Sequence, residues 1–269
     1  MIRLPAVAGR FYPSNPAQLN QELDSLLTSG IHKTKIRAQA CLVPHAGYTY
    51  SGHVAGAVYN RLEIPDRVIL VGPRHFPHGA SFAILSEGAW KTPFGLAAVD
   101  HSLAEKIMRA CPLLREDSVA HESEHSLEVQ LPFLQRLAPR FTFVPIVIGP
   151  AQYVNLEALG VAIAEVIVSE PEPVLVIASS DMNHYEPEDV TRVKDRKAID
   201  RILALDPRGL FDTVRNEQIS MCGYGAAVAM LTALRRTSAA HAELVRYATS
   251  GEINGDFREV VGYTGMIFY

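Results

Sequence analysis

Three apolar stretches of this 269-residue chain each run into a turn that carries a histidine. The stretches are Cys41–His45, Val68–His75 and Val174–His184. In a protein that alternates strands and helices, short uninterrupted apolar runs are typical of parallel strands buried on both faces. Ligands bind such sheets just beyond the carboxyl ends of the strands. We therefore expect His45, His75 and His184 to face one site, together with Asp181 from the third stretch.

The rest of the chain alternates between strand-like and helix-like segments. Pro16 predicts the start of a helix that ends at Gly30. Strands are predicted at residues 38–44, 67–72, 81–86, 141–148, 173–178, 242–249 and 259–268. Further helices are predicted at residues 51–62, 101–111, 124–137, 153–168, 190–205, 207–216 and 224–236. This order predicts one α/β domain over residues 1–269, with a mostly parallel sheet covered by helices and an antiparallel pair of strands at the end.

Composition limits the partners that the protein can have. The chain has 25 Lys and Arg against 29 Asp and Glu, for a net charge of -4, and it has no long basic stretch, which argues against nucleic-acid binding. No apolar run approaches the ~18 residues that a membrane helix needs, and no secretion signal is recognisable, so we expect a cytoplasmic protein without membrane contact. The cysteines Cys41, Cys111 and Cys222 have no close spacing, and no disulfide is expected.

Residues 121–125 read His-Glu-Ser-Glu-His, which matches the H-E-x-x-H pattern of zinc proteases. That chemistry needs both histidines one turn apart on a single helix. Ser123 is instead typical of the residue that begins a helix, because the apolar stripe starts only at Leu127. We therefore expect His121 in a preceding loop and disfavour the protease interpretation, while His125 can still face a site from the first turn.

Asp181 and Cys222 carry further chemistry. A carboxylate near His184 fixes the tautomer of the imidazole or raises its basicity, although Asp181 is equally suited to cap a helix. Cys222 directly precedes an amphipathic segment that starts at Ala226. The N-terminus of a helix lowers the pKa of a thiol and favours the thiolate that binds metals. A single histidine at a strand end is more often a structural hydrogen-bonding residue, but three in equivalent positions favour a shared site.

Six segments form a distinctive set over nearly the whole chain. They are PAVAGRFYP at 5–13, PHAGYTYSG at 44–52, GPRH at 72–75, EHSLEVQLP at 124–132, SSDMNH at 179–184 and CG at 222–223. In these segments the chain resembles the Memo-like family. That family is similar in turn to LigB-type extradiol dioxygenases, which cleave aromatic rings with non-haem Fe(II) held by two histidines and a glutamate. The resemblance implies a LigB-like, three-layer α/β/α fold with a mixed, mostly parallel central sheet and a site at one sheet edge.

The resemblance also implies roles for individual residues. His45 and His75 match the two metal-binding histidines, and Cys222 stands where the dioxygenases have their carboxylate. The other matching pocket positions, expected to be catalytic, are His184, Asp181 and His125. Because sulfur is a softer donor than oxygen, a set of two histidines and a cysteine suits copper and zinc as well as Fe(II). We expect Fe(II) as the bound metal, with copper or zinc as alternatives.

The leading functional hypothesis is a metal-dependent oxidoreductase, with iron or copper, that acts on a small molecule or peptide. In it, Asp181 orients His184 as a proton donor or acceptor, and His125 hydrogen-bonds a ligand of the metal. The alternative is a non-catalytic binding or accessory module, since prokaryotic relatives are often encoded beside a radical-SAM protein and an AMMECR-like protein. Zinc-dependent hydrolysis ranks lower, as does a Cys222 nucleophile with His184 as base, because no oxyanion hole is recognisable.

Overall fold

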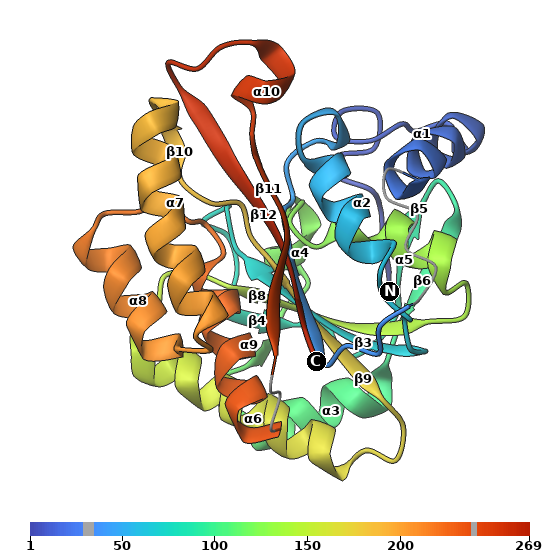
Figure 1. Ribbon diagram of the computed structural model, residues 1–269. Coiled ribbons are helices and arrows are strands. Elements are labelled where there is room, and N and C mark those ends of the chain that lie inside the picture. The colour runs from blue at the N-terminus through green and yellow to red at the C-terminus, as the bar shows by residue number, and fades with distance from the viewer. Residues whose placement is uncertain (29–34, 238–240) are drawn as a thin grey trace.

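The computed structural model describes residues 1–28, 35–237 and 241–269. Twelve strands of this part form one mixed sheet, whose main path is β1-β5-β6-β8-β3-β9-β2-β12-β10 (Figure 1). Off this path, β11 pairs with β12, β4 with β8, and β7 with β4. The strands are β1 (Ile2–Arg3), β2 (Ala40–Val43), β3 (Arg67–Pro73), β4 (Phe82–Ile84), β5 (Ala89–Thr92), β6 (Gly95–Val99), β7 (Arg115–Glu116), β8 (Thr142–Ile148), β9 (Val174–Ser179), β10 (His184–Glu186), β11 (Ala242–Thr249) and β12 (Val260–Phe268).

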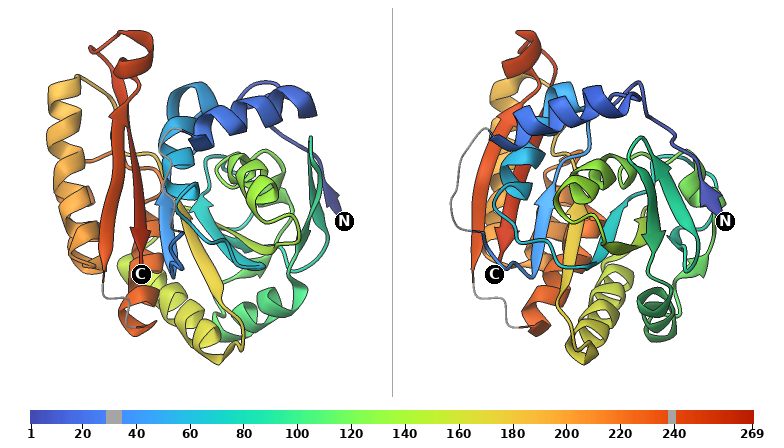
Figure 2. Two further views of the ribbon diagram at one scale, coloured as in Figure 1. Left: turned by 45° about the vertical axis from the view of Figure 1, so that its right-hand side comes forward. Right: turned by 90° about the vertical axis from the view of Figure 1, so that its right-hand side faces the viewer.

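Helices pack on both faces of this sheet (Figure 2). They are α1 (Pro16–Thr28), the π-helix η1 (Tyr48–Gly52), α2 (His53–Tyr59), α3 (His101–Ala110), α4 (Val119–Glu122), the 3-10 helix η2 (Glu128–Gln130), α5 (Leu131–Leu137), α6 (Tyr153–Ser169), α7 (Glu188–Leu203), α8 (Pro207–Asn216), α9 (Tyr224–Thr237) and α10 (Gly251–Asn254). Among these described residues, no helix has both the length and the apolar character needed to cross a lipid bilayer.

Alternate residues of the central strands enter two different cores. Leu42 and Ile69 pack into the core that α3, α6, α8 and α9 cover. Their neighbours Cys41 and Leu70 pack into the opposite core, under α1, α2 and α5. A strand that buries both of its faces reads as an unbroken apolar run, which is why these strands were recognisable in the sequence. The predicted three-layer α/β/α architecture with a mostly parallel sheet is confirmed.

The strands β8, β3, β9 and β2 are parallel neighbours, so their carboxyl ends meet at one edge of the sheet. β12 runs antiparallel to β2 and to β11. The predicted antiparallel pair at the end of the chain is thus confirmed. In Figure 1 the β11–β12 hairpin, drawn in red, extends beyond the body of the protein and carries α10 at its tip.

Two predicted helices are interrupted in the structure. The helix expected at residues 51–62 is divided into η1 and α2, which ends at Tyr59. The helix expected at residues 124–137 begins as a turn, continues as η2 and becomes α-helical only from Leu131. Pro132 lies in the first turn of α5, and a proline there has no N–H to continue a hydrogen-bond ladder from the preceding segment. The predicted end of the first helix at Gly30 lies outside the described residues.

The β5–β6 hairpin was not predicted. Its strands are short and only half buried, and β6 consists largely of glycine and alanine, which are depleted in strands. A turn signal was nevertheless present, because Pro93 and Gly95 follow Thr92. Gly95 adopts a φ of 111°, a conformation that residues with a side chain rarely take up.

A buried ion pair fastens the N-terminal segment to the body. Arg3 lies 2.7 Å from the Glu128 carboxylate, and the two side chains are 4% and 0% exposed. The same carboxylate accepts hydrogen bonds from the backbone N–H groups of Ala6 and Val7 and from the Tyr12 hydroxyl. Every oxygen of this buried charge therefore has partners, which offsets much of the cost of removing it from water.

We predict that Arg3→Met destabilises the protein by about 3–5 kcal/mol, because it leaves the Glu128 charge buried without its counter-charge. Urea unfolding followed by circular dichroism measures this change. Arg37→Met is the control, since Arg37 and its partner Glu63 are 83% and 50% exposed. The control should leave the free energy of unfolding nearly unchanged, and equal stabilities of the two variants would contradict the role given to the buried pair.

Candidate metal centre

The carboxyl ends of three neighbouring strands meet at one cavity. His45 follows β2, His75 follows β3 and Asp181 follows β9, and these strands are adjacent in the order β3-β9-β2. All three residues line a cavity of about 610 Å³, which His184 and Cys222 also line. The expectation that the three apolar stretches face one site is therefore met by the structure.

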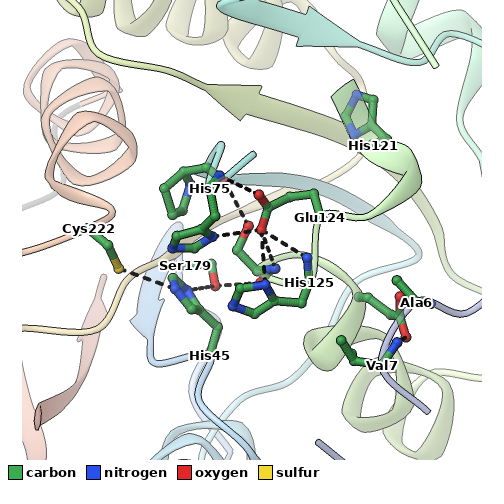
Figure 3. Close-up of polar contacts among 12 residues, drawn as sticks. Ala6, Val7, His45, His75, His121, Glu124, His125, Ser179 and Cys222 are labelled. Atoms are coloured by element: carbon green, nitrogen blue, oxygen red, sulfur yellow. Dashed lines mark hydrogen bonds and ion pairs between the residues drawn. The ribbon is translucent and has the colours of Figure 1, made fainter. Parts of the chain in front are cut away.

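His45 is buried and held from two sides. Its ring Nδ1 lies 2.9 Å from the Ser179 hydroxyl, and its backbone N–H donates to the Asp181 carboxylate at 2.7 Å. Its other ring nitrogen, Nε2, lies 3.2 Å from the Cys222 sulfur (Figure 3). Burial lowers the pKa of His45 well below its usual value, and the nearby His75 lowers it further. The ring is thus neutral at pH 7, as a metal-binding imidazole must be.

Glu124 connects two of the histidines. Its carboxylate accepts hydrogen bonds from the His75 backbone N–H at 2.6 Å, from His75 Nδ1 at 2.9 Å, and from the backbone N–H groups of His125 and Ser126 (Figure 3). Although burial opposes ionisation, the hydrogen bonds from the His75 ring and backbone hold the pKa of Glu124 well below its usual range. A carboxylate on Nδ1 leaves Nε2 of His75 free for a metal, an arrangement common behind metal-binding histidines.

His125 completes a cluster of three imidazoles. Each of His45, His75 and His125 offers one ring nitrogen to this cluster, and these three nitrogens lie within 4.8 Å of one another. The rings of His75 and His125 stack with their centroids 4.6 Å apart. Burial lowers the pKa of His125, which again favours the neutral form. The cluster therefore contains the two expected ligands, His45 and His75, and also His125, which was expected to be a catalytic residue.

Cys222 lies beside this cluster, two residues before α9 begins at Tyr224. Its sulfur is in contact with His45 Nε2 and accepts the Asp181 backbone N–H at 3.3 Å. Burial and the charge of Asp181 raise the pKa of the Cys222 thiol. The helix N-terminus alone therefore does not create the thiolate that the sequence suggested, and a bound cation would be needed to favour it.

Asp181 and His184 do not form the expected pair. In the described part of the chain no hydrogen bond joins them, and Asp181 instead accepts the backbone N–H of His45. Burial raises the pKa of Asp181. The Nδ1 atom of His184 is buried and has no partner among the described residues. Asp181 therefore fixes the backbone of a candidate ligand, and His184 lines the cavity without an Asp181 partner.

His121 lies apart from the cluster (Figure 3). It belongs to the short helix α4 rather than to a loop, and its fully buried ring packs against Trp90 with the ring centroids 5.6 Å apart. α4 ends at Glu122, so His121 and His125 do not follow each other on one helix. The H-E-x-x-H string accordingly does not assemble a zinc-protease site.

Glu124 and Ser179 were missed as parts of the site. Ser179 lies behind His45, and it also donates a hydrogen bond to the backbone carbonyl of Ser126 at 2.7 Å. From the sequence, Glu124 was interpreted only as part of a helix start. Its position next to His125 in the chain does not reveal that its carboxylate accepts a hydrogen bond from His75, which is 49 residues away. Its place between His121 and His125 was the one available signal.

The fold is similar to that of a solved structure, an uncharacterized protein from Escherichia coli K12. The TM-score is 0.56 at 13% sequence identity, over 86% of this chain and 100% of the other. This likeness concerns the fold alone.

Closer sequence relatives carry a family name. A MEMO1 family protein of Aquifex aeolicus is 42% identical to this chain, with 99% of each chain covered. Another, from Methanopyrus kandleri, is 39% identical over 100% of this chain and 99% of its own length. Residues 3–267 also match the family described as Memo-like protein. Because this match spans nearly the whole chain and includes all the cavity residues, the chain belongs to the Memo-like protein family.

Proposed function

We propose that this Memo-like protein binds a transition-metal ion at the histidine cluster and is a metal-dependent oxidoreductase. The observation that carries the proposal is the convergence of His45, His75 and His125, whose ring nitrogens lie within 4.8 Å of one another. Two of these rings are held from behind, His45 by Ser179 and His75 by Glu124. Such support fixes the tautomer and the direction of a metal-binding imidazole.

His45, His75 and Cys222 are the proposed ligands. A sulfur and an imidazole nitrogen bound to one tetrahedral ion, at ~2.3 Å and ~2.0 Å, lie roughly 3.5 Å apart. The distance between Cys222 Sγ and His45 Nε2 is 3.2 Å, which fits two ligands of one ion. The close approach of His125 supports a second ligand set, in which His125 replaces Cys222 or adds to it. Fe(II) is the proposed metal, and copper or zinc would also suit these donors.

A bound iron or copper ion would supply the one-electron chemistry with O₂ that amino-acid side chains lack. The surrounding residues would bind the substrate and move protons. His184 lines the cavity, so its ring is the proposed proton donor or acceptor. Phe11, Tyr185 and Tyr263 form part of the cavity wall, and a volume of about 610 Å³ has room for a small molecule or a peptide side chain.

We predict that Co(II) added to the metal-free protein gives an absorption band from thiolate-to-cobalt charge transfer. Cys222→Ser should remove this band because it removes the sulfur, whereas His125→Gln should keep it. His45→Ala should abolish stoichiometric binding. Titration followed by ultraviolet and visible absorption measures all three variants.

The exposed His101 on α3 provides a matched control, and His101→Ala should behave like the wild type. If Cys222→Ser keeps the spectrum of the wild type and His125→Gln loses the metal, the set of three histidines is the correct one. If none of the variants changes cobalt binding, the site proposed here does not bind metal.

Glu124→Gln should weaken metal binding by about 10–100-fold, the usual effect of removing a carboxylate behind a metal-binding histidine. The amide keeps the shape of the side chain but removes the charge that His75 contacts. Glu122→Gln is the control, because Glu122 is exposed only two residues away. Competition with a chromophoric chelator measures the affinities, and equal affinities for both variants would rule out a role for Glu124 in supporting the metal.

Oxidoreductase activity has its own test. Fe(II)- or Cu(I)-loaded protein with an excess of ascorbate should consume O₂ faster than the same metal in buffer, and metal-depleted protein should not. An oxygen electrode records the rate. A protein that binds metal at His45 and His75 but consumes no O₂ above the buffer rate would contradict the oxidoreductase proposal and favour a binding module.

A further inference from the structure

A second, smaller cavity adjoins the metal centre. It has a volume of about 140 Å³ and lies between the end of β3, the loop after β8 and the start of α9. His75 and Cys222 line both this cavity and the larger one. A molecule in the small cavity would therefore lie next to two of the proposed metal ligands.

Arg74 provides the one permanent charge among the residues that line this cavity. The hydrogen bonds that its side chain makes in the described part of the chain go to the backbone carbonyls of His78 and Gly79, at 3.1 Å and 2.5 Å, and none goes to a carboxylate. Its Nε atom is buried and has no hydrogen-bond partner among the described residues. Buried cations are normally paired, so a half-buried guanidinium with a free donor and no counter-charge requires an explanation.

The guanidinium of Arg74 packs closely against a glycine. A Cβ atom at Gly149 would lie 3.2 Å from Arg74 Nη2 and 3.3 Å from Nε. Gly223 and Gly225, at the start of the 14-residue helix α9, also line the cavity. The positive end of its dipole adds to the field of Arg74, and no acidic residue lines the cavity to oppose it.

We propose that this cavity binds a small oxyanion, a carboxylate or a phosphate group, with Arg74 as its main contact. The planar guanidinium offers two parallel N–H donors that match the oxygens of such a group. The anion would supply the missing counter-charge. The site does not depend on the metal, but it would hold the charged end of a ligand beside His75 and Cys222.

The proposal is tested by titrating the protein, treated with a chelator so that no metal can hold the anion, with inorganic phosphate and separately with acetate. Isothermal titration calorimetry at constant ionic strength should detect saturable binding of at least one of them to a single site. Arg74→Met should weaken that binding at least tenfold, and Arg74→Lys should weaken it less. The anion that binds more tightly identifies the phosphate or the carboxylate as the group recognised.

Arg109→Met is the matched control, because it removes one positive charge from an exposed position on α3. It should bind the anion as the wild type does. Gly149→Ala is a second variant that keeps Arg74 but crowds its free edge, and it should also weaken binding, with thermal unfolding checked by circular dichroism. The proposal is overturned if neither anion binds saturably, or if Arg74→Met binds it as tightly as the control.

Discussion

The buried carboxylate of Glu124 organises the proposed metal centre. It receives four hydrogen bonds, two from His75 and one each from the backbones of His125 and Ser126. A buried carboxylate is stable only when its oxygens accept hydrogen bonds, so the donor groups of His75, His125 and Ser126 are held in place around Glu124. Arg3 adds a further constraint, because it donates to the backbone carbonyl of Glu124 and pairs with Glu128. The N-terminal segment, the turn at His125 and the end of β3 are thereby joined.

The parallel sheet supplies the other half of the arrangement. Val43 and Ser179 are register partners on β2 and β9, so His45 and Asp181, two residues further along, remain neighbours. Asp181 then fixes the His45 backbone, while Ser179 fixes its ring. Burial keeps His45 and His125 uncharged by lowering their pKa values. Neutral rings with their directions set from behind are what a metal ion requires, and they cost little reorganisation when it binds.

The sequence was informative where local pattern and three-dimensional role coincide. The apolar runs before His45, His75 and Asp181 predicted parallel strands that end at one site, whereas the adjacency of those strands came only from the structure. Roles that depend on contacts across the chain were not predictable in this way. The hydrogen bond from His75 to Glu124 spans 49 residues, and the pKa of Cys222 depends on burial more than on the helix that follows it. The interruption before Pro132 was missed because the apolar stripe from Leu127 continues through it, and the β5–β6 hairpin was missed because its strands are short and half buried.

The central claim is that His45, His75 and Cys222 hold one metal ion. It is tested most directly by a crystal structure of the protein loaded anaerobically with Fe(II), with diffraction data collected on both sides of the iron absorption edge. The account predicts one anomalous peak within bonding distance of His45 Nε2, His75 Nε2 and Cys222 Sγ. An iron peak elsewhere in the molecule, or no iron peak in a crystal of iron-loaded protein, would contradict it.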